Sequence, residues 1–201
     1  MKLAIILTIL SMIIGGCSTL QESPSVPIIN TTNKISGTQD LLLGDQEIQQ
    51  LGLTTYLNES DLNLFGLSKG TNCGTEESYS NIVDSSVGQY SLCVYYLNDT
   101  QIIIELQKFA DYEALNGSYQ YSSSHLFSVE GLISENEFGD QSTFRVNNEH
   151  DYGGESNPPG VYFYHLWVTQ DLYLIHITSK GSEDAKGYIT KIGRQILSKL
   201  G

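Results

Sequence analysis

Alternating apolar and polar positions in two parts of the chain predict two β-hairpins. The first joins a strand over residues 90–97 to a strand over residues 101–109 through an Asn-Asp pair, which is typical of a tight turn. The second joins residues 161–169 to residues 172–179. Because the strands of a hairpin run antiparallel, these segments predict an antiparallel sheet.

Apolar residues at helical spacing predict three helices. A short helix through Ile48 and Leu51 ends at Gly52, where a left-handed cap forms readily. A second helix begins after Asp111, and a third begins after Ser182. The apolar positions of the third fall on one face: Ala185, Ile189, Ile192, Ile196 and Leu200. We expect this C-terminal helix to bury that face against the sheet.

The remaining strand signals are weaker. Residues 141–146 read as a strand after a Gly-Asp turn, residues 63–67 as a weak strand, and Cys73 lies in a long polar loop. Residues 127–133 fit either a helix or a strand. Helices separated from antiparallel hairpins predict an α+β fold, with a single antiparallel sheet of about five to six strands and the C-terminal helix packed on one face.

The first residues have the pattern of a signal peptide. Lys2 precedes an apolar run over residues 3–14, which is too short to span a bilayer as a helix, since that needs about 20 residues. The following Ile14-Gly15-Gly16-Cys17 resembles the lipobox of prokaryotic lipoproteins, whose cysteine is acylated and becomes the new N-terminus. The resemblance implies removal of residues 1–16 and lipid attachment at Cys17. An ordinary secretory signal or an uncleaved N-terminal anchor is the alternative.

The segment after the signal predicts a spacer between the membrane and the folded part. Residues 17–39 are rich in Ser, Thr, Asn and Pro without a helical or strand period, so we predict a flexible tether before a single domain at residues 40–201. The chain carries 23 acidic and 10 basic side chains, for a net charge of −13. Such a charge disfavours nucleic acid as a partner and repels anionic lipid headgroups. We therefore expect the domain to stand off the extracytoplasmic face of the cell membrane.

The cysteines and asparagines suggest covalent features of an exported protein. With Cys17 assigned to the lipid, Cys73 and Cys93 are the only remaining pair, for which a disulfide is the simplest expectation. The alternative, two thiols that bind a metal, lacks a nearby Cys or His pair at ligand spacing. Four asparagines begin Asn-x-Ser/Thr glycosylation sequons: Asn30, Asn58, Asn98 and Asn116.

The second hairpin holds the candidate chemistry. If Gln170-Asp171 forms its turn, His165 lies opposite His176, with Trp167 on the same side of the sheet. Opposed side chains have Cβ atoms about 4.5–5.5 Å apart, which is close enough for two imidazoles to share a metal or a proton. A third metal ligand would have to come from the preceding loop, from Glu149, His150 or Asp151. The alternative is two half-buried histidines that are hydrogen-bonded to their surroundings beside Trp167.

Known catalytic motifs are missing from the sequence. It contains no Gly-x-Ser-x-Gly, P-loop, His-Glu-x-x-His or EF-hand pattern, so we predict a protein that is not an enzyme and carries no cofactor. Tyr162 and Tyr164 share one strand face, which is either a recognition surface or covered by the C-terminal helix. We expect a module that binds a protein partner in the envelope. The alternative is a lipoprotein that binds a small ligand or metal around His165, His176 and Trp167.

Three short segments carry a resemblance over most of the chain. They are Gln107-Lys108-Phe109 before a helix, Gly139-Asp140-Gln141-Ser142 at a turn, and Ile175-His176-Ile177-Thr178 before the last helix. With them the chain resembles archaeal lipoproteins of unknown function that have a PsbP-like body. The resemblance implies an anchored extracytoplasmic domain, with no established catalytic residues to transfer.

Overall fold

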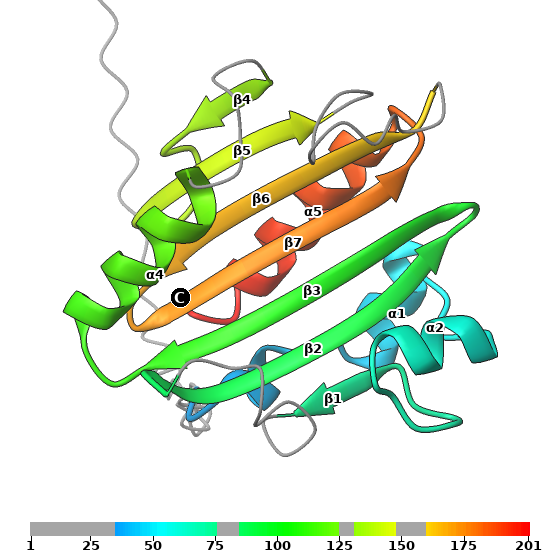
Figure 1. The fold of residues 1–201 in the computed structure, drawn as a ribbon, viewed down its shortest axis with the longest axis horizontal. Helices are drawn as coiled ribbons and strands as arrows, with labels where there is room; N and C mark the ends of the chain where they lie inside the picture. The colour runs from blue at the N-terminus through cyan, green and yellow to red at the C-terminus, as the bar shows by residue number, and fades with distance from the viewer. Residues whose placement is uncertain (1–34, 76–84, 125–130, 148–159) are drawn as a thin grey trace, which may run out of the picture. The chain divides into compact units, whose positions relative to one another are not determined.

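Seven antiparallel strands form one sheet in the order β1-β2-β3-β7-β6-β5-β4 (Figure 1). The structure is a computed structural model that describes residues 35–75, 85–124, 131–147 and 160–201. All described residues belong to one compact unit, Lys34–Gly201. The α+β fold with a single antiparallel sheet is confirmed. The expected count of five to six strands is wrong, because the sheet ends in two short edge strands, β1 and β4.

The described part of the chain contains five helical segments and seven strands. They are η1 (Thr38–Leu41), α1 (Asp45–Leu51), α2 (Glu59–Leu64), β1 (Cys73–Thr75), β2 (Val87–Leu97), β3 (Thr100–Phe109), α4 (Tyr112–Ser124), β4 (Leu132–Glu135), β5 (Gln141–Asn147), β6 (Tyr162–Gln170), β7 (Tyr173–Gly181) and α5 (Ala185–Leu197). Both predicted hairpins, β2–β3 and β6–β7, are present. They meet at the sheet centre, where β3 pairs with β7.

The turn of the second hairpin differs from the prediction by one position. Gln170 pairs with Tyr173, so Asp171 and Leu172 form the turn, and Asp171 has a left-handed φ of 53°. His176 therefore lies opposite Trp167, and His165 lies opposite Thr178. Because side chains alternate between the two faces of a strand, this shift of pairing by two residues leaves all predicted neighbours on the same face.

Four other local predictions are corrected by the structure. Residues 63–67 are not a strand, because Asn63 and Leu64 end helix α2. Asn58 caps this helix, and its Oδ1 accepts a hydrogen bond of 2.9 Å from the Asp61 amide. Cys73 begins the edge strand β1 instead of lying in a loop. The last helix begins at Ala185, since the carbonyl of Ser182 accepts from the Ala185 amide in a preceding turn. Residues 35–39 belong to the folded part and not to the predicted tether, because Ile35 and Thr38 pack against the sheet.

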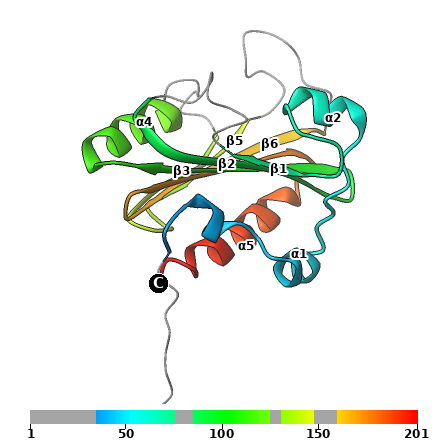
Figure 2. The same cartoon turned by 90° about the horizontal axis from the view of Figure 1, so that it is seen from below.

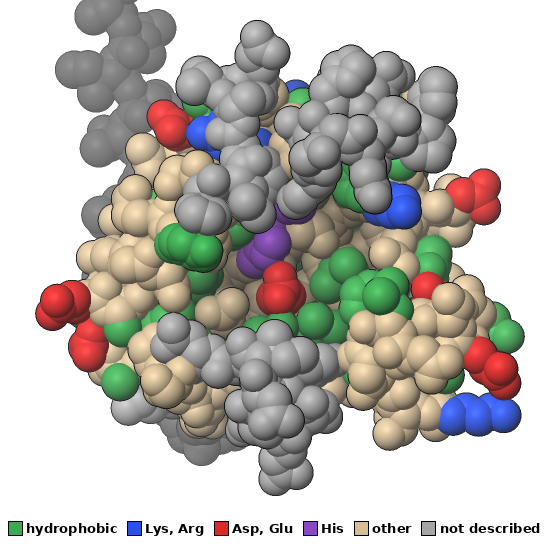
Figure 3. Space-filling view, viewed as in Figure 1, with side chains coloured by type: hydrophobic (Ala, Val, Ile, Leu, Met, Phe, Trp, Pro, Cys, Tyr) green, Lys and Arg blue, Asp and Glu red, His purple; other side chains and the backbone are tan. Residues whose placement is uncertain are grey.

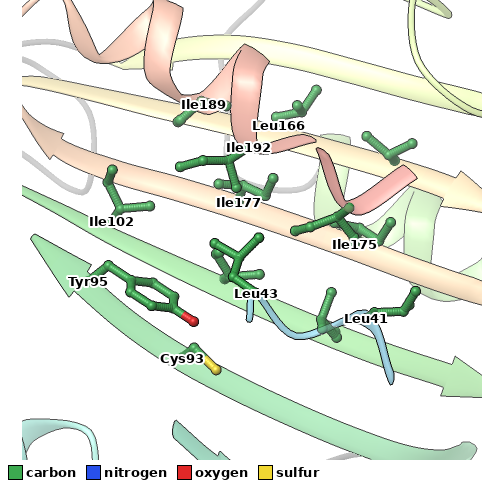
Figure 4. Close-up of a cluster of buried hydrophobic side chains, with 14 of the residues drawn as sticks. Leu41, Leu43, Cys93, Tyr95, Ile102, Leu166, Ile175, Ile177, Ile189 and Ile192 are labelled. Carbon is green, nitrogen blue, oxygen red and sulfur yellow. The ribbon is translucent and has the colours of Figure 1, made fainter. Parts of the chain in front are cut away.

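One face of the sheet, which we call the core face, is closed by apolar packing. α1 and α5 lie under it, and α5 buries the predicted residues Ala185, Ile189, Ile192 and Ile196 (Figure 2). Figure 4 shows Ile189 and Ile192 close to Leu166 and Ile177 of the sheet, and all four are at most 1% exposed. The packing of the C-terminal helix on one face is therefore confirmed.

Polar contacts fix the ends of this face. Lys199 Nζ lies 2.7 Å from Glu47 Oε2, and Gln195 Nε2 donates to Glu47 Oε1 over 2.7 Å, so α1 is tied to the end of the chain. Tyr164 is buried on this face, and its hydroxyl donates to the Glu183 carbonyl over 3.0 Å. The C-terminal segment therefore covers Tyr164, which was a candidate for an exposed recognition surface. In the described part of the chain, no helix is both long and apolar enough to cross a membrane.

The opposite face is covered only toward its two ends by described helices. α4 packs against Phe109, Trp167 and Leu174 at one end, where Leu115 and Tyr119 are its buried contacts. The segment around α2 covers Leu92 and Val94 of β2 at the other end. Figure 2 shows both helices on the same side of the sheet, opposite α1 and α5. The middle of this face lies between them, and it carries the candidate site.

Candidate functional site

Three neighbouring strands place polar side chains at the middle of the face between α2 and α4. Glu105 of β3 lies directly opposite His176 of β7. His165 of β6 is the diagonal neighbour of His176, since the direct partner of His176 is Trp167. We call this surface, defined by Glu105, His165, Trp167 and His176, the histidine face. Figure 3 shows histidine side chains beside an acidic side chain near the middle of this view.

A continuous chain of hydrogen bonds links these side chains. The Tyr90 hydroxyl donates to Glu105 Oε1 over 2.8 Å, and His176 Nδ1 lies 2.7 Å from Glu105 Oε2. A carboxylate only accepts, so Nδ1 of His176 carries the proton. When His176 is neutral its Nε2 is an acceptor, and this atom lies 3.3 Å from His165 Nδ1. Glu105 therefore fixes the tautomer of the central imidazole and directs its free nitrogen toward the second histidine.

The two imidazoles meet edge to edge on the face of an indole. Their ring planes differ by 16°, and their centroids are 5.5 Å apart, which exceeds the nitrogen separation by about the width of a ring. The facing nitrogens therefore lie between the two ring centres. The Trp167 ring stacks on His176 at 4.7 Å and on His165 at 5.2 Å, with interplanar angles below 10°. Trp167 is only 2% exposed, so it forms a fixed platform held beneath α4.

The environment sets the charge of two members of this hydrogen-bonded chain, Glu105 and His165. Burial by itself raises the pKa of Glu105, but the hydrogen bond and charge of His176 and the Tyr90 hydrogen bond outweigh it and lower the pKa. Burial, and then the charge of His176, lowers the pKa of His165 to about 3. At neutral pH, Glu105 is therefore an anion and His165 a neutral imidazole. His176 and Glu105 keep side-chain exposures of 18% and 27%, so solvent reaches this end of the chain.

The structure brings together the three residues that the sequence singled out, His165, His176 and Trp167, and adds two that it did not. Glu105 is the one charged residue in the apolar run over residues 102–106 of β3, and its place in that run is the only sequence signal for it. Tyr90 gave no signal, because its role depends on the pairing of β2 with β3. Cys17, Asn30 and the suggested third ligands Glu149, His150 and Asp151 lie outside the described residues. The sequon residues Asn58, Asn98 and Asn116 are all exposed.

The sequence suggested two possible metal sites, one at Cys73 and Cys93 and one at His165 and His176. Cys73 and Cys93 form a disulfide with an S–S distance of 2.06 Å, so these sulfurs are not metal-binding thiols. Across residues 35–75, 85–124, 131–147 and 160–201, no group of three or more His, Cys, Asp or Glu is arranged to hold a metal ion. Any metal at the histidine face would therefore use two described protein ligands at most, with its other positions open.

A polar pocket of about 460 Å³ borders the histidine face. It lies between α4 and β5, and its walls include Tyr119, Thr143 and Arg145. Thr143 is the register partner of Trp167, and Arg145 is the partner of His165. The Tyr119 hydroxyl and Thr143 Oγ1 are hydrogen-bonded at 2.9 Å. The pocket therefore adjoins the indole and imidazole row without containing it, and it offers space for a ligand that reaches beyond the histidines.

Comparison with known proteins adds no residue roles to this site. What the residues do is therefore inferred from their geometry and chemistry. No family model matches the chain, and no curated protein matches its sequence.

Proposed function

We propose that this chain is a lipid-anchored extracytoplasmic binding protein, and that its ligand site is the histidine face. The observation that carries the proposal is the hydrogen-bonded chain from Tyr90 through Glu105 and His176 to His165, at the centre of a largely apolar sheet. Stability alone does not require these groups, because apolar residues in place of a buried ion pair are often neutral or stabilising. Ionisable groups with shifted pKa values concentrate at functional sites.

The contrast between the two faces of the sheet supports a small-ligand site over a tyrosine recognition surface. The core face is filled by apolar side chains, and Tyr164 is buried there beneath the C-terminal segment. On the histidine face, His176 and Glu105 remain partly exposed beside a polar pocket. Ligand sites combine a rigid apolar wall with a few oriented polar groups, and Trp167 with the imidazoles has this composition.

The anchor explains where such a site would work. Acyl chains on Cys17 would each contribute about 0.8 kcal/mol per buried CH₂, so two or more chains hold a folded domain on a membrane. The net charge of −13 keeps the domain away from anionic headgroups. The Cys73–Cys93 disulfide fits an oxidising, extracytoplasmic compartment. These features together favour a domain that captures its ligand outside the membrane.

Replacing the anchor cysteine tests the location. The Cys17→Ser variant, expressed in the native host, should move from the membrane fraction to the soluble fraction, because it cannot be acylated. The measurement is immunoblotting of both fractions after a carbonate wash, with the wild-type chain as the reference. Retention of the variant in the washed membranes would show that another segment anchors the chain.

Native mass spectrometry tests the binding function. Protein purified from its own membranes in mild detergent should carry a non-covalent mass adduct, and the adduct should be lost in Glu105→Gln and His176→Phe. Glu47→Gln is the matched control, since it makes the same chemical change on the core face and should keep the adduct. Absence of any adduct on the wild type, or equal adducts on all four proteins, would contradict the proposal.

A further inference from the structure

We infer that the ligand of the histidine face includes a divalent transition metal of the zinc and copper class, bound by His176 Nε2 and His165 Nδ1. This inference rests on the proposed function and names the chemistry of its ligand. The two nitrogens face one another over 3.3 Å. Imidazole is a favoured ligand of zinc, copper and nickel, and no thiol is needed for such a site.

The spacing of the two nitrogens suits coordination. Two imidazole nitrogens that each bind one tetrahedral metal at about 2.0–2.1 Å are separated by about 3.3 Å. A metal ion bound by both nitrogens would lie beside the line that joins them, and it would replace the hydrogen bond between His165 and His176. When the metal binds, neutral His165 carries its proton on Nε2 instead of Nδ1, and His176 keeps its proton on Nδ1. The change at His165 is therefore only one of tautomer.

The surroundings of His176 are those of a metal ligand. A histidine that binds a metal nearly always donates its other N–H to a carboxylate or carbonyl, which fixes the tautomer and the ring orientation. Glu105 receives that proton over 2.7 Å, and the Tyr90 hydroxyl in turn holds the carboxylate. Glu105 and Tyr90 are therefore positioning residues that present Nε2 of His176 to the metal.

The second histidine is prepared for coordination in a different way. The position of His165 is fixed by packing, since the side chain is only 7% exposed. Its Nδ1 faces Nε2 of His176 over 3.3 Å. The indole of Trp167 stacks on both imidazole rings, and the facing nitrogens lie at the ring edges. Packing against Trp167 therefore fixes the orientation of both rings, with their nitrogens facing one another.

An open site follows from the number of protein ligands. Structural zinc sites are closed by four protein ligands, whereas sites that bind exchangeable ligands leave positions for water or another donor. Here two positions are histidines, and the others would hold water or donor atoms of the bound molecule. The exposure of His176 gives access from solvent. The site would therefore bind a metal ion or a metal complex reversibly and would not hold one ion permanently.

Titration of the full chain with metal alone tests this inference. The detergent-purified protein, freed of metal by a chelator, is titrated with zinc sulfate in a calorimeter and with copper sulfate by fluorescence. Trp167 is the only tryptophan, so its emission reports this site directly. We expect one equivalent of zinc to bind with a Kd in the micromolar range or below, and copper to quench the emission.

Four variants separate the site from other metal ligands of the chain. His165→Phe and His176→Phe keep an aromatic ring on Trp167 and should abolish this binding. Glu105→Gln should weaken it by about 10-fold to 100-fold, as loss of a partner that orients a ligand does. Glu47→Gln on the core face should leave it unchanged. Circular dichroism checks the fold, and Glu105→Gln decides the matter if a phenylalanine variant fails to fold.

Two results would overturn the inference. One is a wild type whose zinc binding is weaker than the micromolar range, and the other is equal binding by wild type and Glu105→Gln. An organic adduct in native mass spectrometry that depends on Glu105, without metal binding, would remove the metal and leave the proposed binding function intact. Absence of any organic adduct, with metal binding that depends on the histidines, would leave the metal as the only ligand.

Discussion

Lowering the pH from 7.5 to 4.5 is expected to reduce the free energy of unfolding by about 2.7 kcal/mol through His165. Burial, followed by the charge of His176, lowers the pKa of His165 to about 3 in the folded protein. In the unfolded chain a histidine titrates near about 6.5, so below that pH only the unfolded state takes up this proton. Each pH unit in this window removes about 1.4 kcal/mol, and the loss ends near the folded value.

The His165→Phe variant isolates this contribution. Urea unfolding of wild type and variant at both pH values, followed by Trp167 emission, should show that the variant loses about 2.7 kcal/mol less than the wild type. Glu47→Gln is the control. Burial raises the pKa of Glu47, but bonds from Lys199, Gly44 and Gln195 outweigh it and lower the pKa. Its stability contribution is therefore lost only below about pH 4.5, and the control should follow the wild type down to that pH. Parallel losses in wild type and His165→Phe would show that His165 is protonated in the folded state.

The low pKa of His165 affects both the stability of the fold and the chemistry of the site. A group that resists protonation this strongly destabilises the fold in acid and in return offers a neutral nitrogen at every physiological pH. Glu105 behaves in the opposite sense, since its lowered pKa contributes stability that is lost as the pH falls below its ordinary value. A fall in pH therefore removes stability through both His165 and Glu105, and the site is most stable at neutral pH.

The sequence predicted the parts of the fold that repeat a regular pattern. Both hairpins and the C-terminal helix contain enough alternating or helical positions to show their period. β1 has three residues and β4 has four, which is too few to show alternation, and the expected strand number was therefore low. Residues 63–67 gave a false strand signal, because helix α2, which Asn58 caps, extends through Asn63 and Leu64.

The candidate site was predictable only within one hairpin. His165, Trp167 and His176 lie in β6 and β7, so period-2 alternation placed them on one face even though the assumed turn was wrong. Glu105 reaches His176 across a sequence separation of 71 residues, through the pairing of β3 with β7. No local pattern encodes that pairing. The electrostatic character of the site therefore appeared only with the sheet order.

Reduction of the Cys73–Cys93 disulfide is expected to lower the free energy of unfolding by about 3 kcal/mol. The bond closes a loop with a sequence separation of 20 residues, and the chain-entropy estimate for such a loop is about 3 kcal/mol. The two cysteines are direct register partners, and β1 is a three-residue edge strand. With the bond broken, few backbone hydrogen bonds hold β1. The amides of Gly74 and Thr75 should then exchange with solvent before those of β2.

The measurement uses the Cys17→Ser chain, because Cys73 and Cys93 are then its only cysteines. Urea unfolding with and without a phosphine reductant should differ by about 3 kcal/mol, and hydrogen exchange should locate the first loss at β1. A Cys73→Ser, Cys93→Ala double variant should be insensitive to the reductant. Two free thiols in the native, unreduced protein would contradict both the bond and the oxidising compartment that it supports. A chain that is equally stable with and without reductant would show instead that pairing of β2 with β3 fixes this edge without the covalent link.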